Sequence, residues 1–129
     1  MSQFLLDTQI FIWFAEGDSR LPKNIKMKLL ESEEEILFST VSAWEMAIKV
    51  SVKKLNFRGS VSDLIRRHCG SDFTLLPIGL EDVLAVESLP LIHRDPFDRL
   101  LVAQAQRKDL EIISTDKVFD AYGVKDFIF

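Results

Sequence analysis

Short apolar segments alternate with longer amphipathic segments along the chain, and this alternation restricts the fold more than any other feature of the sequence. Strand-like apolar runs lie at residues 4–6, 35–40, 73–78, 111–114 and 126–129. Segments with helical character lie at residues 8–15, 22–32, 42–55, 61–69, 81–88, 96–108 and 117–122. Because strands that alternate with helices form parallel sheets through right-handed crossovers, we predict an α/β fold with a mostly parallel central sheet.

The size and composition of the chain are typical of one globular domain, which we expect to span residues 1–129. Its 129 residues can bury a proper core, and 47% hydrophobic with 28% charged residues indicates a folded chain rather than a disordered one. Apolar runs stay below the roughly 18 residues of a membrane span, and no basic region precedes the apolar N-terminal stretch. One cysteine and two histidines provide neither a disulfide nor a zinc-ligand set. We therefore expect a cytoplasmic protein without a signal peptide.

The net charge of −4 argues mildly against a protein that coats nucleic acid, because such proteins depend on surplus lysine and arginine. It does not exclude a nuclease, since cations bound at a metal site reverse the local charge of the acids there. A basic run comprises Lys49, Lys53, Lys54 and Arg58. This run is either a solvated face or a surface that guides RNA, and the sequence leaves both interpretations open.

Four acidic side chains lie at strand ends or in the first turn of a predicted helix. Asp7 ends the first strand and Asp116 ends the fourth. Glu45 and Asp98 lie in first turns. Because ligands bind outside the carboxyl ends of the strands in open parallel sheets, we expect all four acids to lie at one edge of the sheet.

A structural interpretation of the same acids competes with a functional one. Asp7 and Asp116 are suitable helix N-caps, and Ser42-x-x-Glu45 matches the capping-box pattern. Asp98 in a first turn suits the helix dipole. However, Glu45 and Asp98 border apolar stripes, where a dipole alone would not hold a carboxylate. A cap also accepts Ser, Thr or Asn, yet an acid is present each time, which favours function.

Carboxylates that converge repel one another, and the sequence offers no obvious buried lysine beside each of them. Mg²⁺ or Mn²⁺ would neutralise such a cluster, because both ions prefer oxygen ligands. Two such ions about 3.5–4 Å apart can hold a phosphodiester, activate water and stabilise the leaving oxygen. Carboxylates without a histidine pair or a positioned cysteine therefore indicate metal-dependent hydrolysis of a phosphate ester.

Four short motifs carry the candidate acids in a fixed order. They are L-L-D-T at 5–8, S-x-x-S-A-W-E-M-A-I-K at 39–49, D-P-F-D-R at 95–99 followed by L-L-V-A-Q-A, and S-T-D at 114–116. Together they resemble the PIN-domain family and, more narrowly, the VapC-type ribonuclease toxins of type II bacterial toxin–antitoxin pairs. The similarity extends from about residue 4 to residue 124. L-L-D alone is a weak signal, but the ordered set is specific.

This resemblance implies a PIN-like three-layer fold, with helices on both sides of the sheet, and a metal-dependent endoribonuclease. It implies that the residues that bind Mg²⁺ or Mn²⁺ and carry the catalysis are Asp7, Glu45, Asp98 and Asp116. The expected products of RNA hydrolysis are a 3′ hydroxyl and a 5′ phosphate. The expected partners are a small cognate antitoxin that blocks the acidic pocket and a second copy of the chain in a homodimer.

The resemblance also assigns supporting positions. Thr8 and Thr115 would be hydroxyls near the site, and Asp95 would be a structural cap, which agrees with its place at a helix start. Two residues depart from the family pattern: Lys53 and Asp109 stand where relatives tend to have glycine. Both lie in predicted turns, so they bear on loop shape rather than on the acids.

Other polar and aromatic residues have mainly structural interpretations. Trp13 and Trp44 lie on apolar helical faces, and we expect them in the core rather than as platforms for bases. His93 is expected to be a surface loop residue. Arg94 and Arg99 either bind phosphate or pair with the neighbouring acids, and the sequence does not distinguish these roles.

Two other functional classes remain possible from the sequence. A catalytically silent PIN-like module would bind RNA or protein, although the intact acids argue against it. A receiver or phosphatase-like α/β domain would use Asp7 as phosphoryl acceptor. A haloacid-type phosphatase needs a second aspartate two residues later, where this chain has Gln9.

Overall fold

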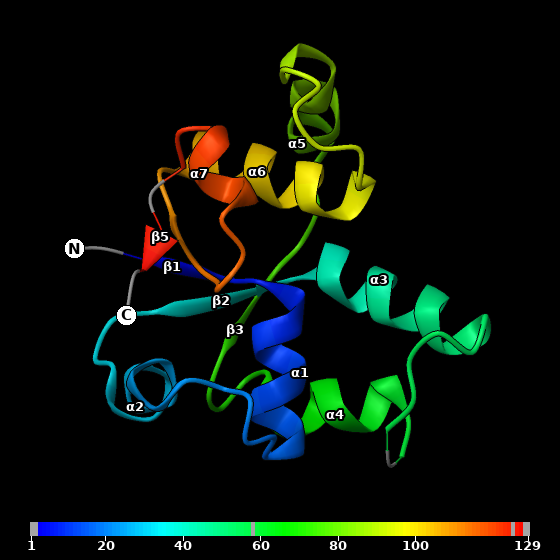
Figure 1. Cartoon of the computed structure of the whole chain (residues 1–129), viewed down its shortest axis with the longest axis vertical. Helices are drawn as coiled ribbons and strands as arrows, with labels where there is room; N and C mark the ends of the chain where they lie inside the picture. The colour runs from blue at the N-terminus through cyan, green and yellow to red at the C-terminus, as the bar shows by residue number, and fades with distance from the viewer. Residues whose placement is uncertain (1–2, 58, 125, 128–129) are drawn as a thin grey trace.

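A parallel sheet of five strands forms the centre of the structure, a computed structural model that describes residues 3–57, 59–124 and 126–127 (Figure 1). The strands are β1 (Phe4–Leu6), β2 (Ile36–Ser39), β3 (Thr74–Leu76), β4 (Glu111–Ile113) and β5 (Asp126–Phe127). Their order in the sheet is β3-β2-β1-β4-β5, and each neighbouring pair is parallel. The predicted α/β class is confirmed, while the last two residues of the predicted fifth strand, 128–129, lie outside the described residues.

Strand β1 occupies the middle of the sheet and is buried along its whole length. Leu5 is level with Leu37 of β2 on one side and with Ile112 of β4 on the other. Because the strands are parallel and in step, the residues that follow them leave the sheet at the same edge. Asp7 and Ser114 therefore emerge next to each other, although they are far apart in the sequence.

Helices cover both faces of the sheet and make it the middle of three layers. They are α1 (Thr8–Glu16), α2 (Lys23–Glu31), α3 (Thr40–Ser51), α4 (Val61–His68), α5 (Leu80–Ala85), η1 (Val86–Ser88, 3₁₀), α6 (Pro96–Lys108) and α7 (Val118–Ala121). The face that carries Leu6 and Phe38 packs against α1, α2 and α4, and the face that carries Leu5 and Ile112 packs against α6 and α7. Figure 1 shows these groups on opposite sides of the sheet, with α3 extending beyond the end of β2. Within the described ranges, none of the helices is long and apolar enough to cross a membrane.

Helix α3 begins earlier than the sequence predicted. Ser39, the last residue of β2, is its N-cap, and the Ser39 side chain accepts a hydrogen bond from the Val41 backbone nitrogen at 3.0 Å. Ser42 therefore lies inside the helix, and the predicted capping box with Glu45 is wrong. The Ser42 hydroxyl instead accepts a hydrogen bond from Thr8 Oγ1 at 2.7 Å, which connects the starts of α1 and α3.

The two positions where glycine is expected both adopt a left-handed backbone conformation. Lys53, just after α3, has a φ of 61°, and Asp109, just after α6, has a φ of 53°. They are the two non-glycine residues with positive φ among those described. Glycine adopts this conformation with little strain, so the departures from the family pattern do fall in turns, as predicted.

The two tryptophans differ in their surroundings. Trp13 is half-buried and packs against the core cluster that contains Phe11, as expected. Trp44 is 50% exposed, and its ring contacts the Phe97 ring edge-on with 4.8 Å between centroids. The prediction of a core position is therefore wrong for Trp44, which lies at the surface against Phe97 of α6.

Candidate active site

A pocket of about 240 Å³ opens at the carboxyl edge of the sheet. Its lining includes residues from α1, α3, α6 and the loops that follow the strands. The lining residues are Asp7, Thr8, Gln9, Ile12, Glu45, Met46, Lys49, Lys54, Leu55, Asp95, Asp98 and Asp116. All four acids predicted from the sequence line this one pocket, so the expected convergence is confirmed.

Asp7 follows β1 and stands at the N-cap position of α1, but its carboxylate does not cap the helix. Asp7 Oδ2 instead accepts a hydrogen bond from Ser114 Oγ at 2.7 Å. Only 8% of Asp7 is exposed. Burial raises the pKa of Asp7 to about 7; the Ser114 hydroxyl lowers it in part, and the charges of Asp98, Glu45 and Asp116 raise it further. The capping interpretation is therefore wrong for this side chain.

Glu45 lies in the second turn of α3 rather than in the first turn predicted, because the helix begins at Thr40. Its side chain is 7% exposed, and Oε2 lies 2.5 Å from Lys49 Nζ, one helical turn later. The expectation that no lysine neutralises the acids is wrong at this position. Glu45 Oε1 is buried and accepts no hydrogen bond from the part of the chain that the structure describes.

The pKa of Lys49 reflects this ion pair. Burial acts to lower the pKa of the ammonium, but the hydrogen bond to Glu45 and the negative charges of Glu45, Asp95 and Asp98 raise it on balance. Lys49 is therefore a full positive charge within an acidic pocket.

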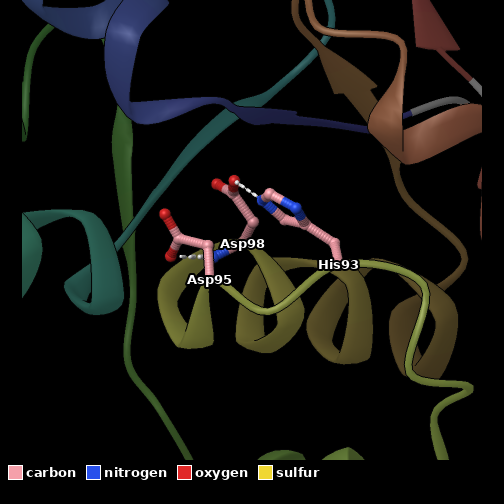
Figure 2. A group of neighbouring side chains, drawn as sticks. All are labelled: His93, Asp95 and Asp98. Carbon is pink, nitrogen blue, oxygen red and sulfur yellow. Dashed lines mark hydrogen bonds and ion pairs between the residues drawn. The ribbon is translucent and has the colours of Figure 1, made fainter.

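Asp98 and His93 contact each other at the start of α6, as Figure 2 shows. His93 Nε2 lies 2.9 Å from Asp98 Oδ2, and the His93 backbone nitrogen donates to the Tyr122 hydroxyl at 2.9 Å. Burial raises the pKa of Asp98 to about 6; the Asp95 charge raises it further, the His93 hydrogen bond lowers it, and Glu45 raises it. His93 lies in the loop before α6, as predicted, but its side chain is only 33% exposed and its ring contacts a candidate ligand.

Asp95 has the capping role that the sequence predicted. Its Oδ1 accepts hydrogen bonds from the backbone nitrogens of Phe97 at 2.8 Å and Asp98 at 3.3 Å. One ligand atom from each of His93, Asp95 and Asp98 nevertheless lies within 4.8 Å of the other two (Figure 2). The cap and the candidate ligand therefore share one acidic corner of the pocket.

Asp116 lies in the turn between β4 and α7, at the exposed rim of the pocket. Its Oδ1 accepts a hydrogen bond from the Val118 backbone nitrogen at 3.0 Å, at the start of α7. The Asp116 backbone nitrogen donates to Ser114 Oγ at 2.9 Å. Ser114 thus contacts two of the four acids, Asp7 through its hydroxyl hydrogen and Asp116 through its oxygen.

The supporting hydroxyls agree only in part with the family pattern. Thr8 lines the pocket and donates to Ser42. Thr115 is exposed, and the hydroxyl that contacts Asp7 belongs to Ser114 instead.

Among the described residues Arg99 does not pair with the neighbouring acids, which was one of the two roles left open by the sequence. Its Nη1 donates to the backbone oxygen of Pro90 at 2.9 Å and to the Tyr122 hydroxyl at 3.2 Å. Its Nη2 donates to the backbone oxygen of Val86 at 3.2 Å. The guanidinium therefore holds the loop that carries His93.

Each of the four acids has one oxygen bonded by the protein and one that remains for a ligand. The bonded oxygens are Asp7 Oδ2, Glu45 Oε2, Asp98 Oδ2 and Asp116 Oδ1. The second oxygen of each accepts no hydrogen bond from any described residue. Hard divalent cations bind carboxylate oxygens that are oriented in this way by a second contact. The four acids therefore supply the type of ligand that Mg²⁺ or Mn²⁺ prefers, while the one group of three ligand atoms that lie within 4.8 Å of one another among the described residues is that of His93, Asp95 and Asp98.

The comparisons with known proteins agree with this architecture. The model of the PIN domain family matches residues 4–125. VapBC2 from Rickettsia felis bound to a promoter DNA fragment has a chain with a TM-score of 0.71 and 13% identity, and 97% of each chain is covered. A chain of DNA-bound VapBC from Salmonella typhimurium has a TM-score of 0.71 and 15% sequence identity, and 98% of each chain is covered. A chain of FitAcB from Neisseria gonorrhoeae has a TM-score of 0.64 and 20% sequence identity, and the match covers 97% of this chain and 96% of the FitAcB chain. At these identities the likeness shows the shared fold, and no curated protein matches by sequence.

Proposed function

Because this chain belongs to the PIN domain family, we propose that it is a metal-dependent endoribonuclease and the toxin of a toxin–antitoxin pair. One observation carries the proposal: four carboxylates from separate parts of the chain line one pocket, and each keeps one oxygen without a hydrogen-bond partner among the described residues. A purely structural set of caps would bond backbone nitrogens, whereas Asp7, Glu45 and Asp98 are bonded by side chains instead.

In this proposal Asp7, Glu45, Asp98 and Asp116 hold Mg²⁺ or Mn²⁺ through their unbonded oxygens. When bound, the divalent ions supply charge that activates water and stabilises the leaving oxygen. Ser114 and His93 fix the carboxylates of Asp7 and Asp98 by hydrogen bonds. Preorganised ligands of this kind require little rearrangement on binding.

The proposed reaction is hydrolysis of an RNA phosphodiester. A water oxygen bonds to phosphorus, the bond from phosphorus to the 3′ oxygen breaks, and a proton passes to that oxygen. The products are a 3′ hydroxyl and a 5′ phosphate. Deprotonated Asp7 and Asp98 are required for cation binding, which the raised pKa values make sensitive to pH near neutrality.

The proposed partner is a small cognate antitoxin that blocks the acidic pocket, and the proposed assembly in the cytoplasm is a homodimer. The solved VapBC and FitAcB structures support a partner of this kind. An acidic, partly enclosed pocket would accept a basic side chain from such an antitoxin.

The direct test is cleavage of single-stranded or looped RNA by purified protein with Mg²⁺, with Mn²⁺ and with EDTA. We expect cleavage only with metal, and ligation of the products should detect 5′ phosphates. A 2′,3′-cyclic phosphate would contradict the mechanism, as would cleavage that persists in EDTA. RNA binding without cleavage under any metal would favour the catalytically silent module.

A further inference from the structure

Lys49 occupies one oxygen of a proposed metal ligand. Its Nζ lies 2.5 Å from Glu45 Oε2, while the second oxygen of Glu45 is buried without a hydrogen-bond partner among the described residues. The two side chains differ in exposure, at 42% for Lys49 and 7% for Glu45. The ammonium therefore reaches from the open side of the pocket onto an enclosed carboxylate.

The other acids have partners of a different kind. Asp7 is bonded by a serine hydroxyl, and Asp116 by a backbone nitrogen. Asp98 is bonded by the ring of His93, and the Tyr122 hydroxyl and Arg99 bond the backbone of His93. These donors are held by short connections to the fold. The Lys49 ammonium, by contrast, is carried on a flexible four-carbon stem. Among the four acids, Glu45 is the one with a lysine or arginine partner in the described part of the chain.

The charge balance of the pocket explains why a cation lies there. Its lining contains five carboxyl groups but only two lysines, Lys49 and Lys54. Like charges that converge in a partly enclosed site repel one another, and a nearby cation offsets that repulsion. A divalent ion at Glu45 would take over this role and would compete with the ammonium for the same carboxylate.

We propose that Lys49 is a displaceable counter-ion: it holds Glu45 in the metal-free protein, releases it when a divalent cation binds, and then binds the scissile phosphate of the RNA. This inference rests on the proposed function and deepens it. The freed ammonium remains on the wall of the pocket, where its three donors can contact a non-bridging phosphate oxygen. Lys49 would thus neutralise the Glu45 carboxylate in the metal-free state and the RNA phosphate in the metal-bound state.

The first test measures Mn²⁺ affinity of metal-free protein at pH 8, from the signal of free Mn²⁺ in electron paramagnetic resonance. Lys49→Met should bind Mn²⁺ about fivefold more tightly than wild type, because the competing cation is gone. Lys53→Met is the matched control: it removes the same charge near the end of α3 but outside the pocket lining, and should change affinity less than about twofold. Equal affinities for the two variants would overturn the displacement.

The second test measures kcat for RNA cleavage at saturating Mn²⁺ and saturating RNA. Lys49→Met should lower kcat roughly 10–100-fold, since it removes a cation from the scissile phosphate. Lys49→Arg keeps a charge and should restore most of the rate, and Lys53→Met should match wild type. Tighter metal binding combined with slower cleavage is the expected signature. An unchanged kcat in Lys49→Met would overturn the phosphate contact.

A measurement on the wild-type protein does not depend on whether Lys49→Met folds. Nuclear magnetic resonance of ¹⁵N-labelled lysine ammonium groups should show the Nζ of Lys49 in the metal-free state, assigned by its absence in Lys49→Arg. Saturating Mg²⁺ should shift that signal or abolish it, and a signal that stays unchanged overturns the inference. If Mg²⁺ and Mn²⁺ do not bind the wild type at all, the proposed function fails instead.

Discussion

Asp7 and Asp95 both precede a helix at its N-cap position, yet their carboxylates do different things. Asp95 Oδ1 accepts hydrogen bonds from two backbone nitrogens of α6. The side chain of Asp7 makes no cap bond to α1, and accepts a hydrogen bond from Ser114 on a neighbouring strand connection. One acid completes a helix, and the other is held ready for a ligand. The position of an acid along the chain does not decide its role; the atoms that it contacts do.

The difference between these two acids arises from the sheet. Asp7 follows the central strand and is surrounded by Glu45, Asp98 and Asp116, whose charges help to raise its pKa. Asp95 begins a helix whose preceding segment is a loop, not a strand. An acid after a central strand is therefore buried among other strand ends, where an unpaired carboxylate is costly unless a cation binds.

The largest effect is expected from removing the charge of Asp7 or Asp98. Asp7→Asn and Asp98→Asn should lower RNA cleavage by roughly 1,000-fold, about 4 kcal/mol of transition-state stabilisation, because hard cations require the carboxylate. Both variants should fold, which circular dichroism can confirm. Glu45→Gln should behave in the same way, and Asp116→Asn less severely, since this residue is at the rim. Wild-type rates in Asp7→Asn and Asp98→Asn would show that these acids serve the fold alone.

Divalent metal should raise the stability of the folded protein. A ligand that binds only the folded state at 100 times its Kd adds about 2.7 kcal/mol to the free energy of unfolding. Melting of the wild type in millimolar Mn²⁺ should therefore occur several degrees above melting in EDTA. Asp7→Asn should lose most of this increase, and Asp95→Asn should keep it. A wild-type midpoint that is the same in both buffers would argue strongly against a metal site.

The fold and the convergence of the four acids on one edge of the sheet could be predicted from the sequence, because both follow from local patterns and from the geometry of parallel strands. Lys53 and Asp109 also fell in turns as expected. The partners of the acids were missed for physical reasons. The bond between Ser114 and Asp7 joins residues 107 positions apart, so it depends on strand register that the sequence does not specify.

One of the other missed contacts had a sequence signal, and another did not. Glu45 and Lys49 are four residues apart on a helix, a spacing that brings side chains together. His93 contacts Asp98 only because the loop before α6 folds back, and that loop path depends on Arg99 bonding its backbone oxygens. Such a path is set by tertiary contacts rather than by periodicity.

His93 offers a smaller perturbation of the same site. His93→Leu removes the hydrogen bond to Asp98 and should weaken Mn²⁺ binding roughly 10–100-fold, as is usual when the partner of a metal ligand is lost. His93→Gln keeps a donor near the same place and should restore much of the affinity. Isothermal titration calorimetry can compare the two. If both variants bind as wild type does, His93 does not position Asp98.

The pH dependence of stability should distinguish Asp7 from a non-titrating side chain. In the folded protein the pKa of Asp7 is about 7, raised from 3.8, so the folded state binds a proton at Asp7 more tightly than the unfolded state does. The stability that this proton contributes is fully present below the unfolded pKa and is lost as pH rises through 7. Without metal, Asp7→Asn should gain about 3 kcal/mol relative to wild type between pH 5 and pH 8. Urea denaturation in EDTA at several pH values measures this. A difference between the two proteins that is independent of pH would contradict the raised pKa.

The smallest effect should come from Asp95, where the cap can be separated from the charge. Asparagine caps a helix about as well as aspartate, so Asp95→Asn should keep its stability, whereas Asp95→Ala should lose roughly 0.5–2 kcal/mol. Cleavage by Asp95→Asn should stay near the wild-type rate, although the acid limb of its pH profile should move to lower pH, because the Asp95 charge raises the pKa of Asp98. Chemical denaturation and a pH–rate profile measure the two effects. If Asp95→Asn lost cleavage as completely as Asp7→Asn, the carboxylate of Asp95 would be a metal ligand as well as a cap, and the contrast between the two helix starts would fail.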